Sequence, residues 1–323
     1  MNRTSPYAAD LLLDIPPDAS LALIFPGQGS QKTGMGKDIA ARTPAARRVF
    51  EAADAALGID LTRLCFEGPD DELRLTANAQ PAILATSIAI LVAALEGAAI
   101  DRRPAFLAGH SLGEYTALVA AGSIGFEDAL RLVRERGALM ARAGVEHPGK
   151  MVALVGLDED AAADICDRSG AEACNYNAPT QIVLGGTPEA IEKAAALAKQ
   201  MGGRALPLNV SGAFHTSLMS SAREDFAAAV DKISIIRPRI PVISNVSAEP
   251  LTSAGSVRTD LKDQITRPVR WHQSITAMIA SGVQTFVEVG PGRVLTAQLQ
   301  RSDPGVRATA VDGARAAAAQ SNV

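Results

Sequence analysis

A single serine lies between two glycines in the stretch AFLAGHSLGEYTAL, residues 105–118. The residues before it are typical of a short buried strand and those after it of a helix, so Ser111 falls at a strand-to-helix junction. The pentapeptide GHSLG fits a nucleophile elbow, in which small flanking residues let the turn tighten until the serine hydroxyl projects from it. The first N–H groups of the helix would then stabilise an oxyanion near Ser111. The alternative is that Ser111 only caps this helix.

A serine nucleophile needs a base to take its proton, and histidine is the usual one. The chain has four histidines. His110 precedes Ser111 on the strand side, so its side chain is expected to point to the opposite face, while His147 lies in a Pro-Gly turn and His272 at a helix start. His215 lies in a loop between an expected strand and an expected helix, where catalytic residues are common. We favour His215 as the base, with a purely structural histidine as the alternative.

Arg136 lies on the apolar side of its expected helix. At about 100° per residue, it shares one arc with small or apolar residues, whereas Arg131 and Arg134 fall outside that arc. The members of the arc are Ala129, Leu130, Val133, Gly137 and Met140. A buried guanidinium needs an anionic partner, because its removal from water is otherwise costly. A salt bridge within the chain would supply one.

The composition of the 323 residues, 47% of them hydrophobic, is that of a soluble globular protein. A formal charge of −4 argues against a general binder of nucleic acid or of anionic membranes. Cys65, Cys166 and Cys174 have neither metal-ligand nor redox spacing, so we interpret them as reduced packing residues of a cytoplasmic protein, without a metal site. The longest apolar run, residues 82–95, is shorter than a bilayer needs and predicts a buried helix that starts at Pro81.

Strand-like and helix-like segments alternate along the chain, which predicts an α/β fold with a parallel sheet. A change of pattern near Glu146 marks an inserted segment long enough for a small ferredoxin-like subdomain. The expected parts are a loose extension at 1–20, a large subdomain at 21–145 and 209–311, the small subdomain at 146–208, and a frayed tail at 312–323.

Six stretches, in order, resemble one family: FPGQGSQ, GHSLGEYTALVAAG, RLVRERGALM, GAFHTSLM, PVRW and VEVGPGRVLTAQL. Together they resemble the malonyl-CoA:acyl carrier protein transacylases of fatty-acid synthesis and the related acyltransferase domains of polyketide synthases. The resemblance covers roughly residues 21–305. It implies an α/β-hydrolase-like large subdomain carrying a ferredoxin-like small one. It also implies a ping-pong reaction without a cofactor, in which Ser111 takes the malonyl group from malonyl-CoA and gives it to the phosphopantetheine thiol of acyl carrier protein.

The resemblance assigns roles to residues that match the family's motifs. Ser111 and His215 would form a dyad without a carboxylate, with the histidine oriented by the backbone carbonyl of Gln264. The backbone N–H groups of Leu112 and Gln28 would form the oxyanion hole. Without the other motifs, the PGQGSQ stretch around Gln28 would be interpreted as a flexible turn.

Two further residues bear on the choice of substrate. By resemblance, Arg136 receives the free carboxylate of malonate in a bidentate contact, which is the alternative to an internal salt bridge. Phe214 belongs to a GAFH tetrapeptide that resembles the pattern of malonyl rather than methylmalonyl selection. It would crowd a branching methyl group, unless it is simply a core residue.

Two other functions stay open at this point. A serine hydrolase that edits stalled acyl chains would need a path for water and would not need Arg136. A non-catalytic docking subunit is disfavoured because the dyad, Gln28 and Gln264 are all present. For the transacylase, which we expect to be a monomer, docking of an acidic carrier would use a local basic patch near the cleft between subdomains. The candidates are Lys193, Lys199 and Arg204.

Overall fold

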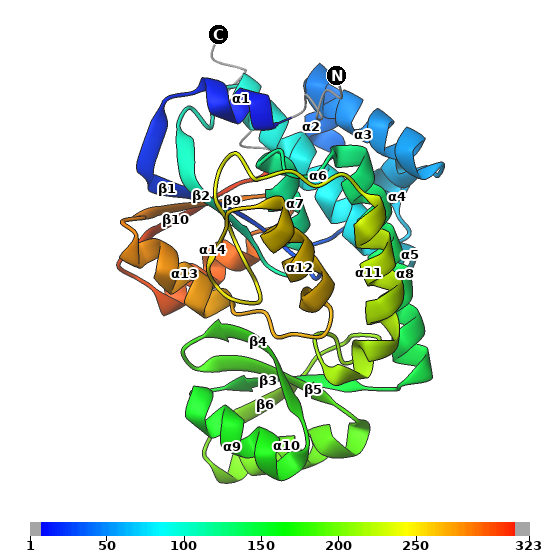
Figure 1. Cartoon of the computed structure of the whole chain (residues 1–323), viewed down its shortest axis with the longest axis vertical. Helices are drawn as coiled ribbons and strands as arrows, with labels where there is room; N and C mark the ends of the chain where they lie inside the picture. Colours follow the sequence, from blue (N-terminus) through cyan, green and yellow to red (C-terminus); the bar gives the residue numbers. More distant parts are fainter. Residues whose placement is uncertain (1–7, 314–323) are drawn as a thin grey trace.

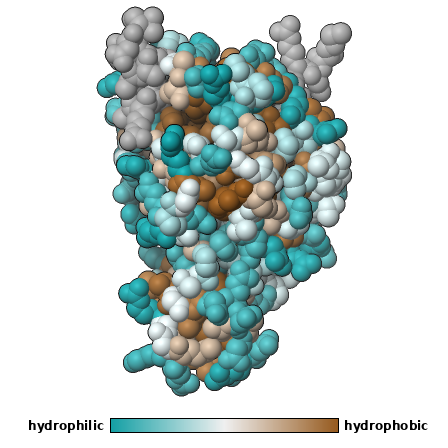
Figure 2. Space-filling model, turned by 90° about the vertical axis from the view of Figure 1, so that its left-hand side faces the viewer, coloured by the Kyte–Doolittle hydropathy of each residue, from teal (hydrophilic) through white to brown (hydrophobic). Residues whose placement is uncertain are grey.

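The structure is a computed structural model that describes residues 8–313. Figure 1 shows two bodies, a large one built on a six-stranded sheet and a smaller one built on a four-stranded sheet. The small body is inserted in the chain between helices α8 (Phe126–Glu146) and α11 (Ser220–Lys232). Figure 2 shows it as a narrower lobe whose surface on this side mixes hydrophilic and hydrophobic residues. The two-part α/β fold predicted from the sequence is confirmed.

The large sheet has the strand order β10-β9-β1-β2-β7-β8, and neighbouring strands are parallel except for β7 and β8. Its strands are β1 (Pro17–Phe25), β2 (Arg103–Gly109), β7 (Val242–Ile243), β8 (Pro250–Leu251), β9 (Thr285–Val289) and β10 (Arg307–Val311). Phe25 at the end of β1 is in register with Gly109 at the end of β2. The loops that follow both strands, with Gln28 and Ser111, therefore leave the sheet at the same edge.

Helices cover both faces of the large sheet. Successive side chains of its central strand β1 point to opposite faces, and because those on both faces are apolar, both faces need to be covered. Leu23 and Phe25 of β1 pack in the main core, whereas Ala22 and Ile24 pack in a second core on the other face. The main core includes residues of α2 (Lys37–Arg42), α3 (Pro44–Leu57), α4 (Leu61–Glu67), α5 (Asp70–Arg74), α6 (Thr76–Glu96), α7 (Leu112–Ala120), α8, α11 and α12 (Ala254–Gln264). The second core includes residues of α13 (Trp271–Ala280) and α14 (Val294–Ser302).

The small body has the order β-α-β-β-α-β of a ferredoxin-like unit. Its elements are β3 (Lys150–Val155), α9 (Glu159–Ser169), β4 (Glu172–Ala178), β5 (Gln181–Gly186), α10 (Pro188–Gln200) and β6 (Arg204–Pro207). The sheet is antiparallel with the order β4-β5-β3-β6, and both helices lie on its outer face, away from the large body (Figure 1). The sequence pattern does not indicate β4, because EACNYNA mixes polar and apolar residues without the alternation of a strand.

The N-terminal region corrects the predicted loose extension over residues 1–20. Helix α1 (Ala9–Asp14) buries Leu12 completely in the main core, and strand β1 begins at Pro17 rather than near Leu21. The paired prolines do not prevent a strand here, because Pro17 is its first residue, a position that proline tolerates. Residues 1–7 of the predicted extension and 314–323 of the predicted tail lie outside the described residues.

Helix α6 corrects a second prediction. It begins at Thr76, so Pro81 lies inside it rather than at its start. With 21 residues it is long and apolar enough to cross a membrane, yet 89% of its most apolar stretch is buried inside the protein. Burial was the correct part of the prediction: α6 is a core helix, and its packing outweighs the backbone hydrogen bond that Pro81 cannot make.

Candidate active site

Ser111 occupies the tight turn between β2 and α7, with backbone angles φ 51° and ψ −103°. Non-glycine residues rarely adopt positive φ, so this backbone is strained. A Cβ on Gly109 would lie 1.9 Å from the carbonyl carbon of Gly113, and a Cβ on Gly113 would lie 2.1 Å from the carbonyl oxygen of Phe25. The close approach of β1, β2 and α7 therefore requires both glycines of the elbow.

The hydroxyl of Ser111 lies 2.8 Å from Nε2 of His215. On the other side of the ring, Nδ1 lies 2.8 Å from the backbone oxygen of Gln264, which can only accept a hydrogen bond. Nδ1 must therefore carry the proton, which leaves Nε2 free to accept the proton of Ser111. The structure thus brings together the serine, histidine and glutamine that the sequence indicated.

His215 is almost fully buried, with 4% of its surface exposed. Its burial, and then the positive charge of Arg136, lower the pKa of His215 to about 3. The imidazole is consequently neutral at neutral pH. Neutrality is the state that a general base requires before it takes a proton.

Arg136 is 1% exposed and lies directly beside the dyad. One terminal nitrogen, NH2, donates to Ser111 Oγ at 3.2 Å and to Gln264 Oε1 at 2.9 Å, while NH1 donates to Gln80 Oε1 at 2.9 Å. Its guanidinium carbon lies 5.3 Å from the centre of the Tyr115 ring. Within residues 8–313 no carboxylate forms a salt bridge with it. The internal salt bridge considered from the sequence is therefore absent from the described chain, and the direct hydrogen-bond partners of Arg136 are neutral.

Gln264 is the last residue of α12, and His215 lies in the loop that leads to α11 through a short 3-10 helix, Ser217–Met219. Arg223 of α11 donates to Asp263 of α12 at 2.6 Å. This ion pair lies next to Gln264 in the sequence. The ion pair connects α11, the helix that follows His215, to α12, whose last carbonyl group orients the His215 ring.

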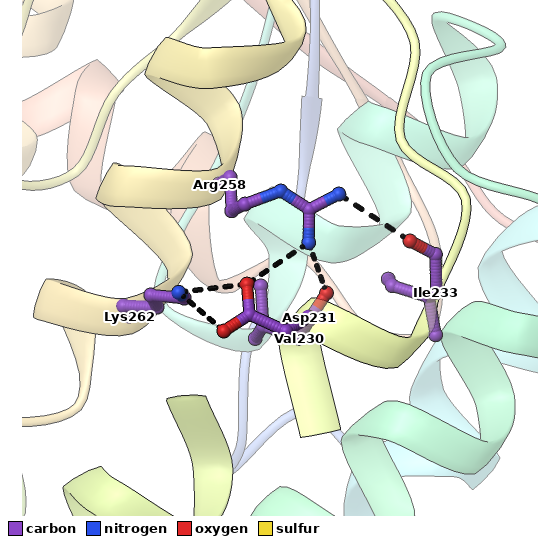
Figure 3. A network of polar contacts seen from close by, with 5 residues as sticks. All are labelled: Val230, Asp231, Ile233, Arg258 and Lys262. Carbon is purple, nitrogen blue, oxygen red and sulfur yellow. Dashed lines mark hydrogen bonds and ion pairs between the residues drawn. The ribbon is translucent and has the colours of Figure 1, made fainter. Parts of the chain in front are cut away.

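A second polar cluster joins the same helices at the other end of α11, as Figure 3 shows. Asp231 pairs with Arg258 at 3.3 Å and with Lys262 at 2.7 Å. Arg258 also donates to the backbone oxygens of Val230 at 2.6 Å and Ile233 at 3.4 Å, which satisfies carbonyls left free at the end of α11. Ion pairs near both ends of α11 thus hold it against α12.

The backbone N–H groups of Leu112, the first residue of α7, and of Gln28 have no hydrogen-bond partner in the described chain. The loop that carries Gln28 packs on the elbow, since a Cβ on Gly27 would lie 2.4 Å from the carbonyl oxygen of His110. Both residues line the cavity that contains Ser111. Their placement is compatible with an oxyanion hole.

The dyad opens into a cavity of about 1070 Å³ that is lined by both bodies. The large body contributes Gln28, His110 and Arg136, and the small body contributes Asn175 and Val183. Phe214 also lines the cavity and is 7% exposed. A space of this size, lined by both apolar and polar side chains, suits an elongated small molecule with polar groups.

Comparison with known proteins agrees with this geometry. The family model described as acyl transferase domain matches residues 22–318. The malonyl CoA-acyl carrier protein transacylase of Bacillus subtilis is 44% identical over 299 residues, which cover 91% of this chain and 93% of the relative. The enzyme of the same name from Escherichia coli K12 is 42% identical, with 92% of this chain and 97% of the relative covered.

This chain belongs to the acyl transferase family. Two solved structures share its fold. An acyl carrier protein S-malonyltransferase from Vibrio cholerae has a TM-score of 0.87 at 39% identity, covering 91% of this chain and 97% of the other. A malonyl-transacylase structure in complex with a type II polyketide synthase acyl-carrier protein has a TM-score of 0.88 at 39% identity, covering 94% and 100%.

His110 of this acyl transferase lies elsewhere than expected. It lines the same cavity as Ser111, and its Nε2 lies 2.8 Å from Oδ1 of Asn177. The expectation of an opposite face assumed the alternation of a regular strand, and that alternation ends where Ser111 turns with a positive φ. His147 is exposed and His272 is half-buried in α13, as expected for residues outside the site.

The cysteines pack as the sequence indicated. Cys65 and Cys174 are buried, and burial raises the pKa of Cys65 to about 12, so its thiol stays protonated. Within the described ranges, no three His, Cys, Asp or Glu side chains group as ligands for a metal ion.

Sequence reasoning missed four residues of the site: Gln80, Glu114, Tyr115 and Asn245. Gln80 and Tyr115 contact Arg136, and Asn245 accepts the N–H of Ser111 at 2.7 Å. Glu114 gave one signal, as a charged residue in an otherwise apolar helical stretch directly after the elbow. Asn245 follows the short strand β7, a position that the pattern does not distinguish from an ordinary turn.

The pKa of His215 predicts a specific dependence of stability on pH. The unfolded chain binds a proton on this residue below about pH 6.5, but the folded protein does so only near pH 3. The contribution of the neutral, buried His215 to the free energy of unfolding is therefore fully present above pH 6.5. It is lost as the pH falls, by up to about 1.4 kcal/mol per pH unit. His215→Asn, which suits the positive φ at this position, removes the titration.

Urea unfolding of both proteins between pH 7.5 and 4.5 measures the effect. The free energy of unfolding of the wild type, relative to that of His215→Asn, should decrease on acidification. A relative stability that is independent of pH would show that His215 titrates normally in the folded protein.

Proposed function

We propose that this acyl transferase moves a malonyl group from malonyl-CoA to the phosphopantetheine thiol of an acyl carrier protein, through an ester on Ser111. The observation that carries the proposal is Arg136, a buried guanidinium 3.2 Å from the Ser111 hydroxyl with no salt-bridge partner in the described chain. A malonyl group on Ser111 would bring a carboxylate within reach of that cation. The names of the curated relatives support the same substrate and acceptor.

In the first half-reaction, His215 Nε2 takes the proton of Ser111, and Oγ attacks the thioester carbonyl of malonyl-CoA. The N–H groups of Leu112 and Gln28 donate to the oxyanion that forms. The intermediate collapses as the carbon–sulfur bond breaks, and the proton on His215 passes to the sulfur of coenzyme A. Malonyl-Ser111 and free coenzyme A result, with no metal or cofactor involved.

In the second half-reaction, the thiol of the carrier's phosphopantetheine gives its proton to His215, and its sulfur attacks the ester carbonyl of malonyl-Ser111. The same two N–H groups donate to the second oxyanion. Oγ of Ser111 leaves and recovers its proton from His215, which regenerates the free enzyme. Orientation of the imidazole by the Gln264 carbonyl, at 2.8 Å, supports both proton transfers.

Two residues would select the acyl group. Arg136 favours a dicarboxylic acyl group, because a neutral acyl group would leave the guanidinium without an anion. Phe214 lines the cavity and would crowd a methyl branch next to the thioester, a discrimination worth about 1–3 kcal/mol. A hydrolase does not require Arg136, and a non-catalytic subunit does not require the Ser111–His215 contact, so both alternatives are less well supported.

The carrier protein would dock at the mouth of the cavity. Arg74 and Arg301 line the cavity and are exposed, next to the exposed apolar side chains of Leu75 and Val294. Asp71 also lines the cavity here, and Arg74 pairs with Asp70 at 3.9 Å, so the case for an acidic carrier depends mainly on Arg301 and the apolar side chains. The neighbouring structure that contains an acyl-carrier protein supports such a partner.

The docking residues suggested from the sequence are less well placed. Lys193 and Lys199 lie on α10, which covers the outer face of the small sheet (Figure 1), and Arg204 begins β6. None of the three lines the cavity.

We also propose that the protein acts as a monomer in the cytoplasm, with neither nucleic acid nor a membrane as a partner. The formal charge of −4 and the three cysteines, which are free of disulfides, support this setting. Whether the carrier serves fatty-acid or polyketide synthesis does not change the chemistry of the site.

Replacement of Arg136 by alanine tests the proposed substrate. Arg136→Ala leaves the malonyl carboxylate unpaired in a desolvated pocket, which should reduce kcat/KM for malonyl transfer by about 30-fold to several thousandfold. Acetyl transfer should change little, because the acetyl group has no carboxylate. The measurement is the ratio of the two acylation rates, followed by the intact mass of the protein, with Ser111→Ala as the variant that forms no adduct. An equal loss for both substrates in a folded variant would make Arg136 a structural residue and would remove the basis for malonyl.

Charge reversal tests the docking site. Arg301→Glu should raise KM for the carrier by about 10-fold at low ionic strength and less at high salt, because electrostatic steering is screened. Lys193→Glu makes the same change of charge outside the cavity and should leave KM for the carrier unchanged. Equal behaviour of the two variants, or a transfer rate independent of salt, would place the docking surface elsewhere.

A further inference from the structure

Glu114 lies in the first turn of α7, three residues after Ser111, and none of its surface is exposed. The proposed reaction gives it no part. A buried carboxylate is costly unless hydrogen bonds compensate it. Two residues from distant parts of the chain supply them: the backbone N–H of Asn245 donates to Oε1 at 2.9 Å, and Nε2 of Gln264 donates to Oε2.

Asn245 connects Glu114 to the nucleophile. Its side-chain oxygen accepts the N–H of Ser111 at 2.7 Å, and its side-chain nitrogen donates to the carbonyl of Gly109 at 2.7 Å. These bonds reach the strained residue and the end of the strand that precedes it. Asn245 therefore fixes the backbone of the elbow at Gly109 and at Ser111.

Gln264 connects Glu114 to the base and to the cation. Its Nε2 donates to Glu114 and to the Ser111 carbonyl at 3.0 Å, so its Oε1 must face Arg136, which donates to it at 2.9 Å. Its backbone carbonyl accepts the N–H of His215. The orientation of this one amide group thus depends on an acceptor at position 114.

We propose that Glu114 is a positioning residue that fixes the relative positions of Ser111, His215 and Arg136. It acts through its hydrogen bonds to Asn245 and to Gln264. The proposal rests on the acyl transfer proposed above. Glu114 touches none of the reacting atoms and acts only through these two residues.

Asp260 of α12 is a second buried carboxyl group close to Glu114. It is 6% exposed, and Ser244 donates to its Oδ1. The other oxygen of Asp260, Oδ2, is buried without a hydrogen-bond partner in the described chain. Burial, then the charge of Asp260, raise the pKa of Glu114. One shared proton would let the pair lie together without repulsion, and it leaves the acceptor sites toward Asn245 and Gln264 in place.

The substitution Glu114→Gln separates positioning from packing. Glutamine has the same shape and keeps one oxygen for the N–H of Asn245, but it presents an NH₂ group to the NH₂ of Gln264. The Gln264 amide should then turn or move, which disturbs both His215 and Arg136. We expect kcat to fall by about 10–100-fold for malonyl and less for acetyl, with KM for acetyl-CoA unchanged.

Asn245→Ala removes the two side-chain hydrogen bonds to Ser111 and Gly109. It keeps the bond to Glu114, because that bond is donated by the backbone N–H. It should slow malonyl and acetyl acylation by the same factor and leave their ratio unchanged. The Asn245→Ala variant also keeps the test decisive if Glu114→Gln does not fold.

The matched control is Glu288→Gln. Glu288 is an equally buried glutamate whose carboxylate accepts hydrogen bonds from the N–H groups of Leu295 and Thr296 at the start of α14. It should keep wild-type rates per folded protein.

Acylation of Ser111 is followed by rapid quench and intact mass, and the folded fraction is measured by circular dichroism. The positioning role would be overturned if folded Glu114→Gln kept both the acylation rates and the malonyl-to-acetyl ratio of the wild type. It would also be overturned if Asn245→Ala acylated as fast as the control Glu288→Gln. Absence of any malonyl adduct on the wild type would instead overturn the proposed function itself.

Discussion

The guanidinium of Arg136 is buried beside Ser111, and its direct partners are amide oxygens, a hydroxyl and an aromatic ring rather than a carboxylate. Isolation of a cation from water carries a large penalty, which these neutral partners reduce without cancelling the charge. Much of the site follows from this constraint. The charge adds to the effect of burial in lowering the pKa of His215, and it leaves an unpaired cation beside Ser111 for an anionic acyl group.

The fold supplies the rigidity that such a charge requires. Strands β1 and β2 end in register, so the Gln28 loop and the elbow meet at one edge of the large sheet. The paired helices α11 and α12 place His215 and Gln264 against that edge, and ion pairs near both ends of α11 fix their separation. The inserted small body then closes the cavity from the other side. The site thus lies between these elements, and each of them contributes to it.

The sequence predicted the parts of the site that depend on local pattern. Ser111 was recognisable from its glycines and its strand-to-helix junction, Arg136 from the arc of its helix, and His215 from its loop and its motif. Glu114 and Asn245 escaped because their roles arise from contacts 131 residues apart in the chain, which no local period encodes. The start of α6 was misplaced because core packing outweighs the usual effect of Pro81, and His110 because the elbow interrupts the strand alternation.

The central claim is that Arg136 is held ready for the carboxylate of the acyl group. A crystal structure of the malonyl-enzyme, prepared with malonyl-CoA in the absence of carrier, tests it most directly. The account predicts an ester on Ser111 whose terminal carboxylate accepts two hydrogen bonds from the guanidinium of Arg136. A malonyl carboxylate directed toward solvent, with Arg136 still bonded only to Gln80 and Gln264, would contradict it.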